Sequence, residues 1–107
     1  MRRIGELIKI RPERLEEYKA YHADPWPEVN RMIKECNITN YSIYHYGEYL
    51  FACYEYTGED YEGDMAKMAA DPATQKWWDV VKPCQQRLEE PDSGSWWTGM
   101  EEVYHLE

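Results

Sequence analysis

Two side chains near the start of the chain, Tyr18 and His22, are spaced for shared chemistry. Residues four apart on a helix lie on one face, so a phenol and an imidazole at these positions point the same way. Histidine has the unperturbed pKa closest to neutrality, so an imidazole can either donate or accept a proton. Residues 24–28 (Asp-Pro-Trp-Pro-Glu) follow at once and force the chain to turn. The spacing therefore predicts a proton-transfer site at the end of a helix.

A purely structural interpretation of the same pair stays open at this point. A helix packed on a sheet can carry an amphipathic tyrosine and a histidine whose imidazole bonds to a backbone carbonyl, with no chemistry involved. The position of His22 at the carboxyl end of its helix favours the functional interpretation, because the helix dipole there stabilises the imidazolium form. A protonated histidine that faces a pocket is a suitable general acid.

Two pairs of adjacent tryptophans are the next candidates. Trp77-Trp78 lies in a helical segment, where neighbouring residues are about 100° apart around the axis, so both cannot face the core. One of the two is therefore expected to line a cavity or to contact a second subunit. Trp96-Trp97 lies in a predicted loop, where exposed tryptophan is typical of an interface or a lid.

The charge of the chain excludes one class of partner. Acidic residues outnumber basic ones by 21 to 12, which gives a net charge of −9. We expect no nucleic-acid partner, because a phosphate backbone requires clustered positive charge. Most carboxylates are expected to form a solvated surface. Those placed to orient His22 or to accept a proton are Glu28, Asp79, Glu101 and Glu102.

The large side chains are mainly aromatic. Leu, Ile, Val and Phe together make up only 16 of the 107 residues, whereas ten Tyr, five Trp and five Met are present. The core is therefore expected to be rich in aromatic residues whose hydroxyl or N–H groups need partners. Such residues also suit a carbohydrate pocket, because a flat ring packs against sugar C–H groups while its polar group meets sugar hydroxyls.

Several further functions lack support in the sequence. No apolar run approaches the roughly 20 residues of a membrane span, so no membrane partner is expected. The three cysteines have no C-x-x-C spacing, which is typical of reduced thiols in a cytoplasmic protein. The three histidines show no ligand spacing, so we expect no metal. No phosphate-binding loop or nucleophile elbow is present, so nucleotide and hydrolase chemistry are not expected.

The hydrophobic pattern predicts one domain, residues 1–107, with the element order β-α-β-β-α-β. Strands are expected at 3–10, 38–46, 49–57 and 100–106, and helices at about 12–23, 27–36, 60–70 and 72–82. Residues 88–99 are expected to form a loop. On the second strand Thr39, Tyr41, Ile43 and His45 are expected to share one face. This order predicts an α+β, ferredoxin-like protomer: a four-stranded antiparallel sheet with helices on one face. The open face is expected both to be covered by a second copy and to be used as a pocket.

Several short segments of the sequence are similar to those of a known protein family. They are the Tyr-x-x-x-His of Tyr18 and His22, residues 26–28 (Trp-Pro-Glu), 40–43 (Asn-Tyr-Ser-Ile), 50–52 (Leu-Phe-Ala), Trp77-Trp78 and 102–106 (Glu-Val-Tyr-His-Leu). Taken together and in this order, they resemble the L-rhamnose mutarotase family over nearly the whole chain. The segment 88–99 departs from the more familiar bacterial members of that family, which leaves the preferred sugar open.

The resemblance implies a dimeric α+β barrel of ferredoxin-like protomers, without metal or cofactor, acting on a monosaccharide. The implied reaction interconverts the α and β anomers of L-rhamnose or a related 6-deoxy-hexose. By motif match His22 takes the proton-donor role, and the sugar-binding positions fall on Tyr18, Tyr41, Trp77 and Trp78. The second acid or base is unassigned. A non-catalytic sugar-binding or regulatory module is the alternative, and an oxygenase of the dimeric α/β-barrel type shares only the topology.

Overall fold

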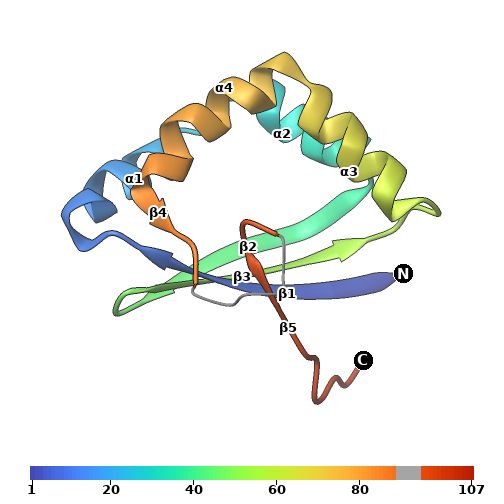
Figure 1. Ribbon diagram of the computed structural model, residues 1–107. Helices are drawn as coiled ribbons and strands as arrows, with labels where there is room; N and C mark the ends of the chain where they lie inside the picture. Colours follow the sequence, from blue (N-terminus) through green and yellow to red (C-terminus); the bar gives the residue numbers. More distant parts are fainter. Residues whose placement is uncertain (89–94) are drawn as a thin grey trace.

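A curled antiparallel sheet, with helices arched over one face, forms the protein in the computed structural model, which describes residues 1–88 and 95–107 (Figure 1). The strands are β1 (Arg2–Ile10), β2 (Ile38–Tyr46), β3 (Tyr49–Tyr56), β4 (Gln85–Gln86) and β5 (Thr98–Met100). Their order in the sheet is β2-β3-β1-β4, and β5 also pairs with β1. The predicted α+β class is confirmed, and this strand order is the one expected of a ferredoxin-like sheet.

Both crossovers contain two helices, separated at prolines. The helical elements are η1 (Pro12–Arg14), α1 (Leu15–Ala23), α2 (Pro27–Glu35), α3 (Tyr61–Ala70), α4 (Pro72–Val81) and η2 (Lys82–Cys84). The first turn after Pro12 is a 3-10 helix, so the α-helix begins at Leu15, later than predicted. The break between α1 and α2 is where the sequence placed it. In the described part of the chain, no helix has the length and apolar character needed to cross a membrane.

The core lies between the helices and the covered face of the sheet. Alternation along β1 and β3 turns every second side chain towards the helices, as in Ile8 and Leu50. Tyr18, Val29 and Trp77 reach down from α1, α2 and α4 to complete the main cluster. A second cluster contains Ile38, Tyr54 and Tyr56. Aromatic residues thus fill much of the core, as the composition predicts.

A bulge in β2 changes one predicted face. Asn40 has a positive φ of 51°, and its amide donates to Glu55 Oε1 at 2.6 Å. The β2–β3 register shifts at this point, so Thr39 pairs with Glu55 whereas Ile43 pairs with Ala52. Glu55 and Ala52 are three residues apart on β3 and therefore point to opposite faces of the sheet. Their partners Thr39 and Ile43 point to opposite faces as well. The prediction that they share a face is wrong, because strict alternation does not anticipate an inserted residue.

The last strand is shorter and earlier than predicted. It spans only Thr98–Met100, and residues 101–107 have no regular structure. A strand over 100–106 was expected from the apolar alternation, but a strand also needs a sheet edge within reach. After Met100 the chain turns away from the sheet (Figure 1), which leaves Tyr104 77 % exposed. Of the predicted loop 88–99, residues 89–94 lie outside the described part.

Asp71 caps α4, the helix that the sequence predicts over 72–82. Its carboxylate accepts from both the backbone N–H and the hydroxyl of Thr74, each at 2.9 Å. The substitution Asp71→Ala should lower the free energy of unfolding by about 1 kcal/mol, because the first turn of the helix loses these bonds. Urea denaturation measures the loss. The exposed Asp79→Ala on the same helix is the control, and an equal loss in both variants would contradict the capping role.

Candidate functional site

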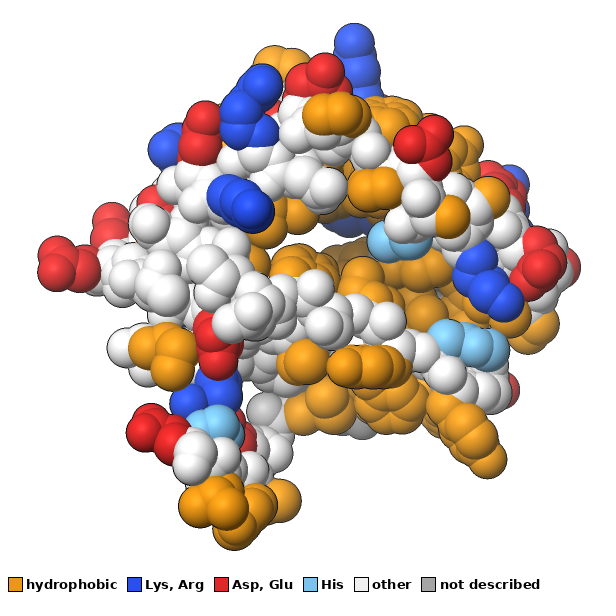
Figure 2. All heavy atoms as spheres, turned by 180° about the vertical axis from the view of Figure 1, so that it is seen from behind, with side chains coloured by type: hydrophobic (Ala, Val, Ile, Leu, Met, Phe, Trp, Pro, Cys, Tyr) orange, Lys and Arg blue, Asp and Glu red, His pale blue; other side chains and the backbone are white. Residues whose placement is uncertain are grey.

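A pocket of about 640 Å³ opens between the helical layer and the sheet. Figure 2 shows the opening from behind, framed mainly by hydrophobic side chains. Four of the five predicted site residues contribute to its lining: His22 from α1, Tyr41 from β2, and Trp77 and Trp78 from α4. These residues are far apart in the sequence, and the fold brings them to one cavity.

His22 sits in the last turn of α1 with its ring orientation fixed. Its Nδ1 lies 2.8 Å from the carbonyl oxygen of Tyr18, one turn earlier. A carbonyl can only accept, so Nδ1 carries the hydrogen and Nε2 is left for proton exchange. The ring also meets the face of Trp77 edge-on, with 5.2 Å between centroids. The bond to the carbonyl and the contact with the indole together hold the imidazole against the pocket wall.

The pKa of His22 differs from the sequence-based expectation. The end of a helix favours the imidazolium form, and the hydrogen bond to Tyr18 does raise the pKa. Burial acts in the opposite direction and is the larger effect, so the pKa of His22 lies below its ordinary value of 6.5. The ring is therefore mainly neutral at pH 7, and its conjugate acid gives up a proton more readily than free imidazolium does.

Tyr18, the fifth predicted residue, lies behind His22 and does not line this pocket. Its ring packs on the imidazole with 4.2 Å between centroids. The hydroxyl accepts from Gln85 Nε2 at 3.2 Å, and Gln85 Oε1 accepts from Trp96 Nε1 at 2.6 Å. Burial raises the pKa of Tyr18 to about 12, so the hydroxyl stays neutral and keeps its own hydrogen to donate.

Gln85 is a residue that the sequence analysis missed. It is 4 % exposed and joins Trp96, near the end of the predicted loop 88–99, to Tyr18 on α1. No motif singles out this glutamine, because its importance comes from burial between two segments that only the fold brings together. Trp96 is accordingly tied to the core by its indole N–H, whatever further role it has as a lid or interface residue.

The two tryptophans of α4 have different surroundings. Trp77 is only 8 % exposed and also meets Trp26 at 5.2 Å between centroids. Trp78 is half-buried, and the ammonium of Lys82 lies 4.6 Å from its ring centroid. The expectation that adjacent tryptophans cannot both be core residues is met: one is packed in the helical layer and the other stands at its edge, and both reach the pocket.

Phenols supply polar groups on the sheet side of the pocket. Tyr41 stacks on Tyr54, with 5.2 Å between ring centroids and 28° between planes. The hydroxyl of Tyr54 in turn lies 2.6 Å from that of Tyr61 on α3. Burial raises the pKa of both Tyr41 and Tyr54, so these groups remain neutral hydrogen-bond donors. The pocket thus combines indole faces on one side with hydroxyl groups on the other.

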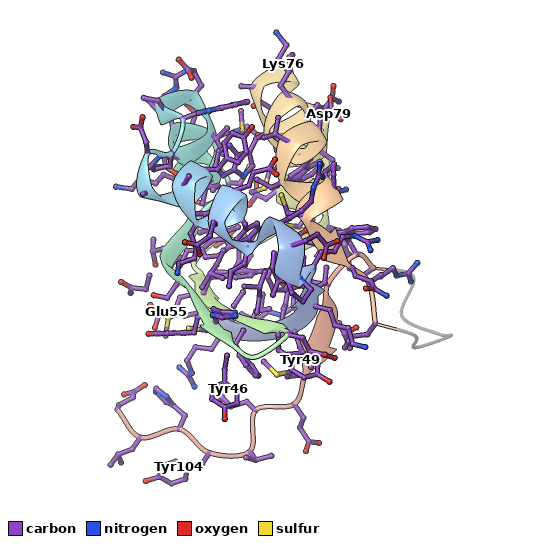
Figure 3. All side chains as sticks on the ribbon, turned by 90° about the vertical axis from the view of Figure 1, so that its left-hand side faces the viewer. Tyr46, Tyr49, Glu55, Lys76, Asp79 and Tyr104 are labelled. Carbon is purple, nitrogen blue, oxygen red and sulfur yellow. The ribbon has the colours of Figure 1, made fainter. Side chains whose placement is uncertain are left out.

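The carboxylates proposed from the sequence do not orient His22, because the Tyr18 carbonyl occupies its Nδ1. Glu28, Asp79 and Glu101 are exposed, and Figure 3 shows Asp79 pointing away from the sheet. Glu102 forms an ion pair with Arg3 at 3.0 Å. Within residues 1–88 and 95–107, no group of three or more His, Cys, Asp or Glu side chains is arranged to hold a metal ion.

Comparisons with known proteins agree over the full length. A family profile described as L-rhamnose mutarotase matches residues 3–106. The L-rhamnose mutarotase of Phocaeicola vulgatus is 32 % identical over 109 residues, which covers 100 % of both chains. The crystal structure of an L-rhamnose mutarotase from Formosa agariphila superposes with a TM-score of 0.78 at 26 % identity and full coverage of both chains. Tetracenomycin F2 cyclase from Streptomyces glaucescens, at a TM-score of 0.71 and 11 % identity, shares the fold alone.

The protonation of His22 can be followed directly by NMR. We expect its imidazole to titrate below pH 6.5 and, in the neutral form, to carry its hydrogen on Nδ1. In the unfolded chain the pKa of His22 has its ordinary value of 6.5, so there the imidazole is protonated at a higher pH than in the native state. The native state therefore loses stability as the pH falls from about 6.5 to the lower native pKa. Comparison with His22→Gln assigns the signal. A native pKa above 6.5 would contradict the dominance of burial.

Proposed function

Because the chain belongs to the L-rhamnose mutarotase family, we propose that it interconverts the α and β anomers of L-rhamnose or a related 6-deoxy-hexose, with His22 as proton donor. Family membership makes the chain an isomerase of carbohydrate metabolism. The observation that carries the assignment of His22 is its place in an aromatic pocket, with Nδ1 bonded and Nε2 left for proton exchange.

Mutarotation needs two proton transfers around one carbon. A proton is delivered to the ring oxygen, another leaves the anomeric hydroxyl, and the bond between the anomeric carbon and the ring oxygen breaks. The resulting carbonyl turns, and the ring recloses from its other side with the protons exchanged in reverse. We assign Nε2 of His22 as the atom that protonates the ring oxygen, because a lowered pKa makes the imidazolium form a ready proton donor.

The aromatic residues are suited to holding the sugar. Trp77 and Trp78 offer flat surfaces for the apolar face of a deoxy-sugar and its methyl group, and Tyr41 offers a neutral hydroxyl. Tyr18 also takes a sugar-binding position in this proposal, and its hydroxyl is oriented by Gln85. Ring opening already proceeds in water, so a positioned acid–base pair that contributes about 10²–10⁴-fold is sufficient catalysis.

Saturation-transfer NMR of anomer exchange tests the proposal. With L-rhamnose, L-fucose and D-glucose as probes, exchange should exceed the buffer rate for at least one deoxy-sugar. His22→Ala should lower the enzymatic rate by about 10²-fold or more, because the proton donor is lost. The exposed His45→Ala is the matched control and should retain full activity. Tryptophan-fluorescence evidence of sugar binding without any exchange would instead support a non-catalytic binding module.

We further propose that two copies associate through the sheet face that the helices leave uncovered. Tyr44 and Tyr46 of β2 are 62 % and 80 % exposed. Figure 3 shows Tyr46, Tyr49 and Tyr104 on the side of the sheet away from the helices. The C-terminal segment adds further apolar side chains with no surface to cover in this chain: Val103, Tyr104 and Leu106. A second copy supplies a matching surface for this set, since a two-fold interface pairs a face with itself.

The oligomeric state is measured by light scattering coupled to size-exclusion chromatography. The chain should elute with twice its mass of 12.9 kDa. Tyr44→Glu should shift the mass towards one chain, because it places a charge in the centre of the proposed interface. Lys76→Glu, on the side of α4 that points away from the sheet in Figure 3, serves as control. A single-chain mass for the unaltered protein would refute the interface.

The cysteines support a reducing compartment, which we propose to be the cytoplasm. Cys36, Cys53 and Cys84 are free thiols. Two of them are buried, and Cys53 on the uncovered face of the sheet is exposed. An accessible unpaired thiol is typical of proteins that are kept reduced.

A further inference from the structure

A carboxylate interrupts the apolar face of the central strand. On β1 the residues that alternate towards the helices are isoleucines, with Glu6 between Ile4 and Ile8. Glu6 is half-buried there. A charged group on the face of a sheet that packs under helices is costly unless it is used or paired. Its place in the strand therefore calls for an explanation.

The neighbours of Glu6 in the sheet are unusually small. Across the strands it pairs with Ala52 on β3 and Gly99 on β5. A Cβ built on Gly99 meets no heavy atom within 4 Å, so the space on that side is open. The carboxylate thus stands in a depression of the sheet surface, where a ligand has room to approach it.

Glu6 belongs to the same row of the sheet as the pocket. Ile43, which lines the pocket, pairs with Ala52, and Ala52 pairs with Glu6. Adjacent strands are about 4.8 Å apart, so Glu6 lies about 10 Å from Ile43 across the small alanine. The charge of Glu6 is also one of the causes that raise the pKa values of Tyr41 and Tyr54. The carboxylate therefore lies near these phenols, on the same face of the sheet and next to the residues that line the pocket.

The direction of α1 brings His22 over this part of β1. Tyr18 bonds to Gln85, which pairs with Ile10 at the end of β1. From there α1 runs back along the sheet, since α2 must deliver the chain to β2 at the opposite end (Figure 1). His22 lies about 6 Å beyond Tyr18, and Glu6 lies about 13 Å before Ile10. The course of α1 therefore carries His22 from the Ile10 end of β1 towards the level of Glu6.

Glu6 also has no competing partner. Among the residues that the structure describes, its carboxylate forms no hydrogen bond and no ion pair, in contrast to Glu102 with Arg3. Burial raises the pKa of Glu6 above its ordinary value of 4.5. A carboxylate without such partners, raised in basicity and in the same sheet row as a residue that lines the pocket, is equipped to take a proton from a ligand.

We propose that Glu6 is the second acid–base group of the reaction, the one that takes the proton of the anomeric hydroxyl while His22 protonates the ring oxygen. This proposal rests on the proposed function. A sugar between the helices and the sheet meets His22 from above and Glu6 from below, so the two proton transfers occur on different sides of the anomeric centre.

The proton balance of this pair is complete. During ring opening the anomeric hydroxyl gives its proton to Glu6, its O–H electron pair forms the carbonyl bond, and the bond to the ring oxygen breaks. That oxygen takes the proton from Nε2 of His22. After the carbonyl has turned, Glu6 returns a proton to the carbonyl oxygen, and His22 recovers one from the attacking hydroxyl. Both residues end in their starting states, and no other reactant is consumed.

The pH dependence follows from the groups around Glu6. The groups whose pKa values Glu6 affects are the hydroxyls of Tyr41 on β2 and Tyr54 on β3, and Tyr54 in turn lies 2.6 Å from the hydroxyl of Tyr61 on α3. The imidazole of His22 and the phenol of Tyr18 belong to the helical layer across from the sheet. The pKa values of Tyr18, Tyr41 and Tyr54 are all raised, so these groups do not titrate with Glu6. Activity should therefore fall at low pH as Glu6 is protonated and at high pH as His22 loses its proton.

Three variants test the role of Glu6 by anomer-exchange NMR on the sugar that the unaltered protein turns over fastest. Glu6→Gln keeps the shape of the side chain and should lower kcat by about 10²-fold, with loss of the low-pH limb of the profile. Glu6→Ala should be similarly impaired and should regain activity when formate is added, because formate replaces the missing carboxylate. Glu16→Gln, on the exposed face of α1, should behave like the unaltered protein.

The outcomes separate this proposal from the proposed function. If the unaltered protein exchanges no sugar faster than buffer, the mutarotase proposal fails and this one with it. If the unaltered protein is active and Glu6→Gln matches it in rate and pH profile, only the role of Glu6 is overturned. A folded Glu6→Ala variant, as judged by circular dichroism, that is impaired but not rescued by formate also overturns it, since a merely structural role gives that result.

Discussion

The packing of Trp77 against three other rings is the contact on which the helical layer depends. Its indole, on α4, meets Tyr21 and His22 of α1 and Trp26 just before α2, at centroid distances between 5.2 and 6.0 Å. All three contacts are edge-on, a geometry that adds about 0.5–1.5 kcal/mol per pair beyond the area buried. The two crossovers of the fold are joined at this residue, so the wall of the pocket and the place of its histidine are set together.

The same packing sets the electrostatics of the site. Because aromatic rings cover His22, burial lowers its pKa despite its position at a helix end. Glu6 on the opposite layer is affected in the reverse sense, since burial disfavours a negative charge as well and raises the pKa of the carboxyl group. The two pKa values therefore move towards each other, so the difference in proton affinity between the imidazole and the carboxylate is smaller than for the free groups. If His22 and Glu6 were exposed, burial would not shift their pKa values in this way.

Local signals in the sequence predicted the elements well where one interaction decides the outcome. The helix predicted over 72–82 begins where Asp71 caps it before a proline. The strands predicted at 38–46 and 49–57 are joined by a tight turn at Gly47, which has a positive φ of 60°. Local signals failed to predict the structure where contacts with a distant segment determine it. The alternation in residues 100–106 resembles a strand, but the chain leaves the sheet after Met100. The bulge at Asn40 depends on the register with β3, which no pattern within β2 contains.

The sequence by itself determined the topology and the identities of the residues most suited to proton transfer and sugar contact. The spacing of Tyr18 and His22 follows from the helical repeat, which is a local property of the backbone. Only the tertiary structure decided the protonation of His22, the burial of Tyr18 under Gln85, and the meeting of Glu6 with the pocket. In the sequence Glu6 is merely an exception in a strand of isoleucines. Its surroundings come from strands and helices that are remote along the chain, and burial and charge depend on distance in space.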